Sequence, residues 1–363
     1  MLQLYSNIFV ILADMACIFE DETPYPSNIK KVLEWQNGYH TSLRQLLKDL
    51  EFEEKASDQA KNFEGLIYTM YDTFYKYAKI DTPKEYIDGI IKHIKEERVQ
   101  VEQRSTQWYE DFGTMVTASE FHKLFDSERT RGQLVISKAN PTPHNSPKAV
   151  STEQLKPMDW GIRFEPIVKQ YLEKLWNCKV YECGRMKHTT QKKLGASPDG
   201  LVTTEGNKYG RLVEIKCPFS RKVGLGIPQD YWMQMQIQME VTNLIECEYV
   251  EVEILSKNPK NLNPEFKESL FSGEVYLLEK EGVYTYSYDR IDNEGYNLIE
   301  VIPYAITKIH NELVLRDKVW YEGTLEKQKE FWDDVEKAKK GEFVLKESSR
   351  AKRVKQCLIV DTE

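Results

Sequence analysis

Two short segments carry residue types and a spacing that suit chemistry at a phosphate. Asp199 lies in a Ser-Pro-Asp-Gly run, and Glu214-Ile215-Lys216 ends a strand-like apolar stretch. Because alternate side chains of a strand face the same way, Glu214 and Lys216 are predicted to project together while Ile215 faces the core. Asp199 is expected on the preceding strand, from which its carboxylate can approach that of Glu214.

This arrangement predicts a site for a divalent metal ion. Two neighbouring carboxylates repel each other unless a cation lies between them. Oxygen ligands of this kind suit Mg²⁺, or Mn²⁺ in its place. Such ions polarise a phosphoryl oxygen and lower the pKa of a bound water; two ions per site, which we expect here, lie about 3.5–4 Å apart. Lys216 is expected to orient or help deprotonate that water and to offset charge on the phosphorane.

Each segment alone is common, because an Asp-Gly turn or a Glu-x-Lys strand usually has only a structural role. The prediction therefore depends on three further elements that occur together with these segments along the chain. A helix over residues 160–175 carries Glu165, which supplies another carboxylate. A helix over residues 230–242 places Tyr231, Gln234 and Gln238 on one face. The amides on that face can bind phosphate or a metal-bound water, although an exposed polar stripe is the alternative.

A third element is Thr117-Ala118-Ser119 at a predicted helix start, with Ser119 as the expected N-cap. Hydroxyls and unpaired backbone amides at a helix N-terminus form a candidate anion site.

The ordered set resembles the lambda-exonuclease-like (YqaJ-type viral recombinase) branch of the PD-(D/E)XK nucleases. The resemblance runs from about Trp108 to Leu255, roughly two fifths of the chain. The matching motifs are Trp108, Thr117-Ala118-Ser119-Glu120, Arg163-Phe164-Glu165, Ser197-Pro198-Asp199-Gly200, Glu214-Ile215-Lys216 and Tyr231-x-x-Gln234-x-Gln236.

The resemblance implies a viral or phage-type enzyme of DNA recombination and repair. It implies metal coordination by Asp199, Glu214 and the backbone carbonyl of Ile215, with help from Glu165, and it assigns Lys216 to the nucleophilic water. The implied activity is Mg²⁺-dependent digestion of double-stranded DNA from a 5′ end, which leaves a 3′ single strand. A single-strand annealing protein is the implied partner.

The resemblance also implies a pocket for the terminal 5′-phosphate, for which Thr117, Ser119, Arg129 and Gln234 match, with Tyr231 beside them. One departure is clear, because the family's arginine shortly after the tryptophan falls at Phe112. Arg104 and Arg131 are the candidates that would compensate. The preference for 5′-phosphate is therefore left open.

Three readings of function follow. The leading one is a 5′-to-3′ double-strand exonuclease. A structure-specific or nicking endonuclease on the same fold is favoured if the end pocket is incomplete. A non-catalytic DNA-binding scaffold is the third, and a complete Asp, Glu and Lys set argues against it.

The predicted architecture is an α/β, restriction-endonuclease-like PD-(D/E)XK core whose mixed central sheet is flanked by helices, preceded by a helical extension. The domains are expected at residues 1–103 (helical domain or arm), 104–345 (nuclease) and 346–363 (basic mobile tail). Besides the two helices above, helices are expected within residues 28–103, and one of them begins with a capping box, Thr82-Pro83-Lys84-Glu85. Further helices are expected after residue 288, and the last of them covers residues 325–340. Strands are expected at 179–183, 195–202, 211–217, 248–255, 275–278 and 283–288.

Composition sets outer limits. The formal net charge of −8 excludes a uniformly basic nucleic-acid binder, so DNA contact requires a local cluster of Lys and Arg. The six cysteines form no CxxC pair, which argues for dispersed thiols in a reducing compartment rather than a zinc ribbon or disulfide framework. The apolar stretch 8–13 is too short to cross a membrane. An intracellular protein, in cytoplasm or nucleus and without a membrane partner, is expected; a homo-oligomer is left open.

Overall fold

The computed structural model describes residues 84–103, 105–141, 149–266, 269–289 and 295–346. The chain divides into two units, Met1–Tyr86 and Ile87–Glu363, and the described residues lie in the second apart from Lys84, Glu85 and Tyr86. The helices expected within residues 28–83, the capping box at Thr82-Pro83, Arg104 and the tail from residue 347 lie outside the described residues. The domain boundaries after residues 103 and 345 stay predictions. No helix in the described ranges is both long and apolar enough to cross a membrane.

The helices and strands follow each other in a mixed order. The helices are α4 (Lys84–Lys92), η1 (His93–Glu97), α5 (Thr106–Phe112), η2 (Ala118–Leu124), α6 (Glu128–Ala139), α7 (Pro157–Trp176), α8 (Gln229–Thr242), α9 (Lys318–Gly323) and α10 (Leu325–Lys339). The strands are β1 (Val116–Thr117), β2 (Val180–Tyr181), β3 (Met186–Lys187), β4 (Leu194–Ala196), β5 (Gly200–Val202), β6 (Leu212–Lys216), β7 (Glu246–Ser256), β8 (Phe271–Lys280), β9 (Val283–Ser287) and β10 (Asn297–Leu315).

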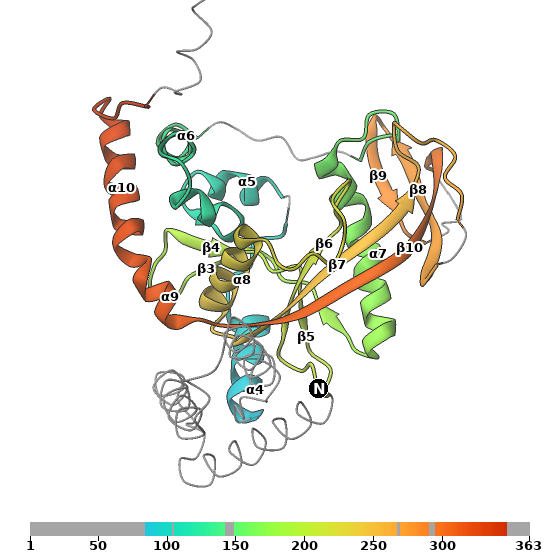
Figure 1. Cartoon of the computed structure of the whole chain (residues 1–363), viewed down its shortest axis with the longest axis horizontal. Coiled ribbons are helices and arrows are strands. Elements are labelled where there is room, and N and C mark those ends of the chain that lie inside the picture. The colour runs from blue at the N-terminus through green and yellow to red at the C-terminus, as the bar shows by residue number, and fades with distance from the viewer. Residues whose placement is uncertain (1–83, 104, 142–148, 267–268, 290–294, 347–363) are drawn as a thin grey trace, which may run out of the picture. The chain divides into compact units, whose positions relative to one another are not determined.

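The main sheet has seven strands in the order β2-β5-β6-β7-β10-β8-β9 (Figure 1). Strands β6 and β7 are parallel, and the other neighbouring pairs are antiparallel. A parallel pair needs a crossover connection, usually a helix, and α8 supplies it between β6 and β7. The predicted α/β class with a mixed sheet is confirmed.

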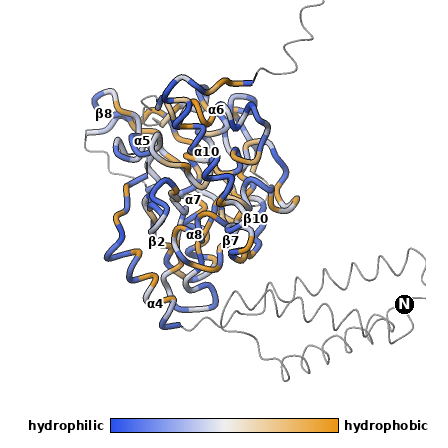
Figure 2. Tube along the Cα trace, turned by 90° about the vertical axis from the view of Figure 1, so that its left-hand side faces the viewer, coloured by the Kyte–Doolittle hydropathy of each residue, from blue (hydrophilic) through white to orange (hydrophobic). Residues whose placement is uncertain are grey.

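The two faces of this sheet pack against different helices. Val213 and Ile215 of β6 belong to the apolar cluster that contains the buried side of α7. Leu212, at the start of β6, belongs to the cluster that contains Met235 and Ile237 of α8. In Figure 2, hydrophobic segments meet around α7, α8 and β7. By strand alternation, Glu214 and Lys216 lie on the side of the sheet that α8 covers.

The strand expected over residues 195–202 is wrong as one element. The chain leaves a three-stranded sheet of order β1-β4-β3 at Ala196 and joins the main sheet at Gly200. Pro198 lies in the break, and proline lacks the backbone N–H that a ladder uses. Asp199 therefore lies just before β5, at the point where one sheet gives way to the other.

The helices expected directly after the β8–β9 hairpin are also wrong for residues 297–315. This segment is the long strand β10, which is antiparallel to both β7 and β8. It is rich in isoleucine and valine, residues that favour a pleated surface. Within the described part of the chain α9 and α10 follow it, and α10 confirms the helix predicted for residues 325–340.

Candidate active site

Asp199 is attached directly to the strand that carries the other catalytic candidates. Gly200 lies opposite Val213 in the antiparallel pair of β5 and β6. The backbone N–H of Ile215 donates to Asp199 Oδ2 over 2.7 Å. This bond holds the carboxylate beside β6 at the residue between Glu214 and Lys216. The side chain of Ile215 faces the opposite way and is buried in the core, as the alternation predicted.

The Glu214 carboxylate is buried, with 1% of the residue exposed, and is bound by three side-chain donors. Gln234 Nε2 and Lys216 Nζ donate to Oε1, the former over 2.6 Å. Gln238 Nε2 donates to Oε2 over 2.6 Å. Burial of an ionised carboxylate is costly unless donors of this kind replace water. The shared face predicted for α8 therefore exists, and it turns toward β6 rather than forming an exposed stripe.

Lys216 is enclosed by the same groups. Its Nζ donates to Gln234 Oε1 over 3.3 Å and lies 4.5 Å from the centroid of the Tyr231 ring. Burial lowers the pKa of Lys216, but the carboxylates of Glu214 and Asp199 outweigh it and raise the pKa above its usual value. Lys216 is thus an ammonium in this arrangement, suited to donating hydrogen bonds.

The carboxylate of Glu165 adds a third negative charge to those of Asp199 and Glu214. The pKa of Asp199 is raised well above its usual value by burial and by the charges of Glu214 and Glu165, more than Lys216 and the Ile215 N–H offset. Glu165 comes from α7, so the two helices that flank the sheet both supply the site. Such a concentration of negative charge is relieved by a cation.

The residues fit a hard divalent ion in their chemistry, although their present oxygens are partly engaged. Across the described ranges, no three His, Cys, Asp or Glu side chains form a group able to hold a metal ion. Glu214 accepts from Lys216, Gln234 and Gln238, and one oxygen of Asp199 accepts from Ile215. A metal ion would compete with the Lys216 ammonium for the same carboxylates.

The Thr117 region differs from its expected form. Thr117, not Ser119, is the N-cap, and the helix that follows, η2, is a short 3-10 helix. The Glu120 side chain returns to this end and accepts from the Thr117 hydroxyl over 3.0 Å, and Lys138 Nζ donates to the same carboxylate over 2.8 Å. Ser119 is exposed and its hydroxyl lies 3.2 Å from that of Thr117. The chain's own carboxylate therefore occupies the end of η2.

The arginines considered for this region have different surroundings. Arg129 is exposed on α6. Arg131 forms an ion pair of 2.8 Å with Asp334 and lies over the ring of Phe331, so it joins α6 to α10. Phe112, which stands where the family has an arginine, is the last residue of α5.

Sequence reasoning missed Arg185, which lies between β2 and β3. Its guanidinium lies 3.8 Å from the Trp108 ring centroid and donates to the Trp108 carbonyl oxygen, and Arg185 is only 2% exposed. Trp108 Nε1 in turn donates to Ser197 Oγ over 3.3 Å, two residues before Asp199. No motif marks Arg185, because its neighbour Trp108 is 77 residues away in sequence.

The strand pairing and the site agree with the resemblance stated above. Asp199 beside a Glu-x-Lys strand, in a mixed sheet flanked by α7 and α8, is the arrangement that the PD-(D/E)XK resemblance predicts. Residues 107–244 match the family model of the YqaJ-like viral recombinase domain, so the family resemblance predicted from the motifs is confirmed for this segment.

The individual proteins that the chain resembles have low sequence identity to it. An uncharacterized protein of Acanthamoeba polyphaga mimivirus is 27% identical over 220 residues, 56% of this chain. The chain spans only 38% of that relative's length. Among solved structures, the alkaline exonuclease of Laribacter hongkongensis is 20% identical with a TM-score of 0.42, and the alignment covers 65% of this chain and 95% of that one. A phage-related exonuclease of Haemophilus somnus is 13% identical with a TM-score of 0.35 (64% and 95% covered).

Proposed function

We propose that this protein is a divalent-metal-dependent deoxyribonuclease that digests duplex DNA from a 5′ end, in viral or phage-type recombination. The observation that carries the proposal is the convergence of Asp199, Glu214 and Lys216 beside the amides of α8. The YqaJ-like domain that contains these residues supports it. A purely structural ion pair would not require a third carboxylate, Glu165, whose charge raises the pKa of Asp199.

Asp199, Glu214, the Ile215 carbonyl and Glu165 are the groups proposed to hold Mg²⁺, or Mn²⁺ in its place, with two ions at the site. When bound, the metal polarises the phosphoryl oxygen and lowers the pKa of a coordinated water. Gln238 donates a hydrogen bond to Glu214 Oε2 and so helps to fix the orientation of the carboxylate.

Lys216 and Gln234 both donate to Glu214 Oε1, and we propose that this end of the carboxylate faces the substrate. Lys216 would donate to the attacking water or to a phosphate oxygen if its bond to Glu214 were given up. Its ammonium offsets charge that develops on the phosphate. Gln234 lies within hydrogen-bond reach of both Glu214 and Lys216 and is proposed to orient them.

Recognition of the DNA end is assigned to residues near Thr117. Ser119, Arg129, Gln234 and Tyr231 are proposed to contact the terminal phosphate or the adjoining strand, and Thr117 joins them if the phosphate displaces the Glu120 carboxylate from its hydroxyl. Arg131 is a weaker candidate, since its guanidinium already serves Asp334. Double-stranded DNA is the proposed substrate, and a single-strand annealing protein is the proposed partner that receives the product.

The test compares linear and closed circular duplex DNA of the same sequence, with Mg²⁺ or with a chelator. Linear DNA labelled at its 5′ end should release label only with Mg²⁺, and the circle should survive. Nicking of the circle would favour the endonuclease. Lys216→Ala should abolish digestion and keep DNA binding, whereas the exposed Lys260→Ala control should digest normally.

End recognition has its own assay. Arg129→Ala should slow digestion of 5′-phosphorylated ends and leave 5′-hydroxyl ends unchanged. Equal slowing on both ends would remove Arg129 from the phosphate pocket without touching the catalytic assignment.

A further inference from the structure

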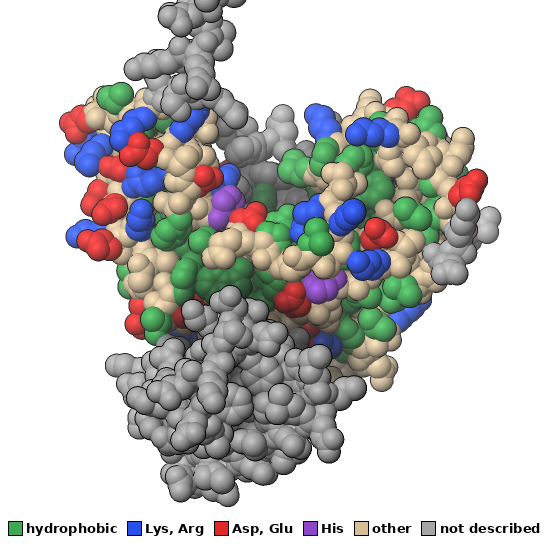
Figure 3. Space-filling view, in the orientation of Figure 1, with side chains coloured by type: hydrophobic (Ala, Val, Ile, Leu, Met, Phe, Trp, Pro, Cys, Tyr) green, Lys and Arg blue, Asp and Glu red, His purple; other side chains and the backbone are tan. Residues whose placement is uncertain are grey.

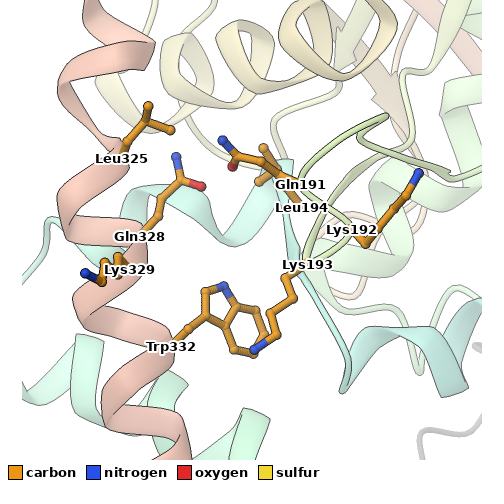
Figure 4. Close-up of a pocket in the computed structure, with 8 residues that line it drawn as sticks. All are labelled: Gln191, Lys192, Lys193, Leu194, Leu325, Gln328, Lys329 and Trp332. Atoms are coloured by element: carbon orange, nitrogen blue, oxygen red, sulfur yellow. The ribbon is translucent and has the colours of Figure 1, made fainter.

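A cleft lies between the turn before β4 and helix α10. Its volume is about 380 Å³, within the range of about 300–1,000 Å³ typical of ligand sites. Figure 4 shows Trp332 reaching from α10 toward Lys193 on the opposite wall. The lining residues are Gln191, Lys192, Lys193, Leu194, Leu325, Gln328, Lys329 and Trp332.

The lining combines positive charge with an aromatic ring. Lys192, Lys193 and Lys329 are exposed, and no acidic residue lines the cleft. Lys193 Nζ lies 4.5 Å from the Trp332 ring centroid, so the ring already receives a cation. This composition contrasts with the surface over α10 and α6, where Figure 3 shows acidic and basic side chains interleaved.

Nearby carboxylates are engaged elsewhere. Asp334, two residues after Trp332, accepts from Arg131 over 2.8 Å and from Lys337 over 3.0 Å. Glu336 forms a 2.9 Å ion pair with Lys339, and its charge also acts on Lys193 at longer range. Among the described residues, Lys192, Lys193 and Lys329 form no direct ion pair, so their ammonium groups can receive an external anion.

The cleft is close to the candidate active site along the chain. Lys193 precedes Asp199 by six residues. A fully extended chain covers at most about 3.3–3.6 Å per residue, so the two lie within roughly 20 Å. The connection runs through β4, which pairs with β1 and therefore with Thr117.

We propose that this cleft binds single-stranded DNA, with an unpaired base taking the place of the Lys193 ammonium on the Trp332 ring and backbone phosphates against the three lysines. Aromatic rings beside a basic groove are the usual means of holding single strands, because every base has a face that can stack. A duplex hides those faces, so the cleft favours the strand that remains when the other is digested. The inference rests on the proposed function for the source of that strand, though not for the binding itself.

The experiment measures binding of a fluorescein-labelled twelve-nucleotide oligothymidylate to the full chain by anisotropy, in chelator to prevent cutting. The pocket variant is Lys192→Gln/Lys193→Gln/Lys329→Gln. The control is Lys337→Gln/Lys339→Gln/Lys340→Gln, which removes the same number of charges from the C-terminal end of α10, outside the cleft. Single strands lose affinity with salt at a slope of about −0.7 per phosphate neutralised, so the pocket variant should flatten the slope by about 2 and the control should not.

Stacking is tested by replacing the ring. Trp332→Leu keeps an apolar side chain against its neighbours and should weaken binding about tenfold, whereas Trp332→Phe should retain most of the affinity. Circular dichroism confirms that each variant is folded. Pocket variants that bind like the control, or a blunt duplex of twelve base pairs that loses affinity as much as the single strand, would overturn the proposal.

The two proposals fail separately. If the protein cuts no DNA but the pocket variant loses affinity for oligothymidylate, the proposed nuclease activity is contradicted and the proposed single-strand site is supported. If the protein digests linear duplex normally but all variants bind oligothymidylate equally, the proposed single-strand site alone is contradicted. An RNA oligomer bound as tightly as the DNA one would contradict the assignment to DNA.

Discussion

Replacing Gln238 by methionine tests whether the α8 amides orient the Glu214 carboxylate for metal. Gln238 is completely buried and gives Glu214 Oε2 its hydrogen bond of 2.6 Å. Methionine has a similar length and cannot donate. A hydrogen bond to a charged group contributes about 1.5–3 kcal/mol, and loss of a partner that orients a metal ligand typically costs about 10–100-fold in metal affinity. A free energy of 1.36 kcal/mol corresponds to about a tenfold change in an equilibrium constant, so about 1.5–3 kcal/mol corresponds to roughly the same 10–100-fold range of metal affinity.

The assay is calorimetric titration with Mn²⁺, together with urea unfolding of the metal-free protein. Gln238→Met should weaken Mn²⁺ binding about 10–100-fold and lower the free energy of unfolding by about 1.5–3 kcal/mol.

The control is Gln236→Met on the same helix. Gln236 is equally buried, but it binds the Leu315 carbonyl and the Asp317 N–H, away from Glu214. This variant should lose stability while binding Mn²⁺ normally. Unchanged Mn²⁺ affinity in Gln238→Met, or an equal loss in Gln236→Met, would refute the reasoning.

Two further predictions concern buried ion pairs. Burial alone raises the pKa of Glu248, but Lys208, Asn311 and Arg211 outweigh it and lower the pKa below its usual value. The stability from this group is thus present above the ordinary carboxyl pKa and is lost as pH falls through the lowered one, so Glu248→Gln should be less stable at pH 7 and decline less on acidification in urea titrations. Lys138→Met leaves the buried Glu120 carboxylate without its cation, which should cost about 3–5 kcal/mol. Adding Glu120→Gln should recover much of that loss in thermal unfolding, and no recovery would contradict the pairing.

The central part of the site could be predicted from the sequence because it depends on local geometry. Strand alternation places Glu214 and Lys216 on one face, and helix periodicity places Gln234 and Gln238 on another. Both rules act over a few residues and need no knowledge of the tertiary fold. The parallel crossover through α8 then brings these two faces together.

What the sequence did not show depends on long-range contacts or on competing local signals. Arg185 meets Trp108 only because separate short strands fold together. The residues on both sides of Pro198 are strand-like, so the sequence predicts one strand through the break. The mixed polar and apolar pattern of residues 297–315 predicts a helix, although pairing with both β7 and β8 stabilises it as strand β10.

The short break between β4 and β5 ties together two regions that otherwise belong to different sheets. Residues 197–199 join the strand beside Thr117 to the strand beside Glu214, and Trp108 holds Ser197 at the start of that junction. If a ligand that displaces β4 also displaces the Asp199 carboxylate, the two sites are coupled. Binding free energies are reciprocal between coupled sites, so the ligand at the Thr117 end and the ion or substrate at the carboxylates would then change each other's affinity by the same factor.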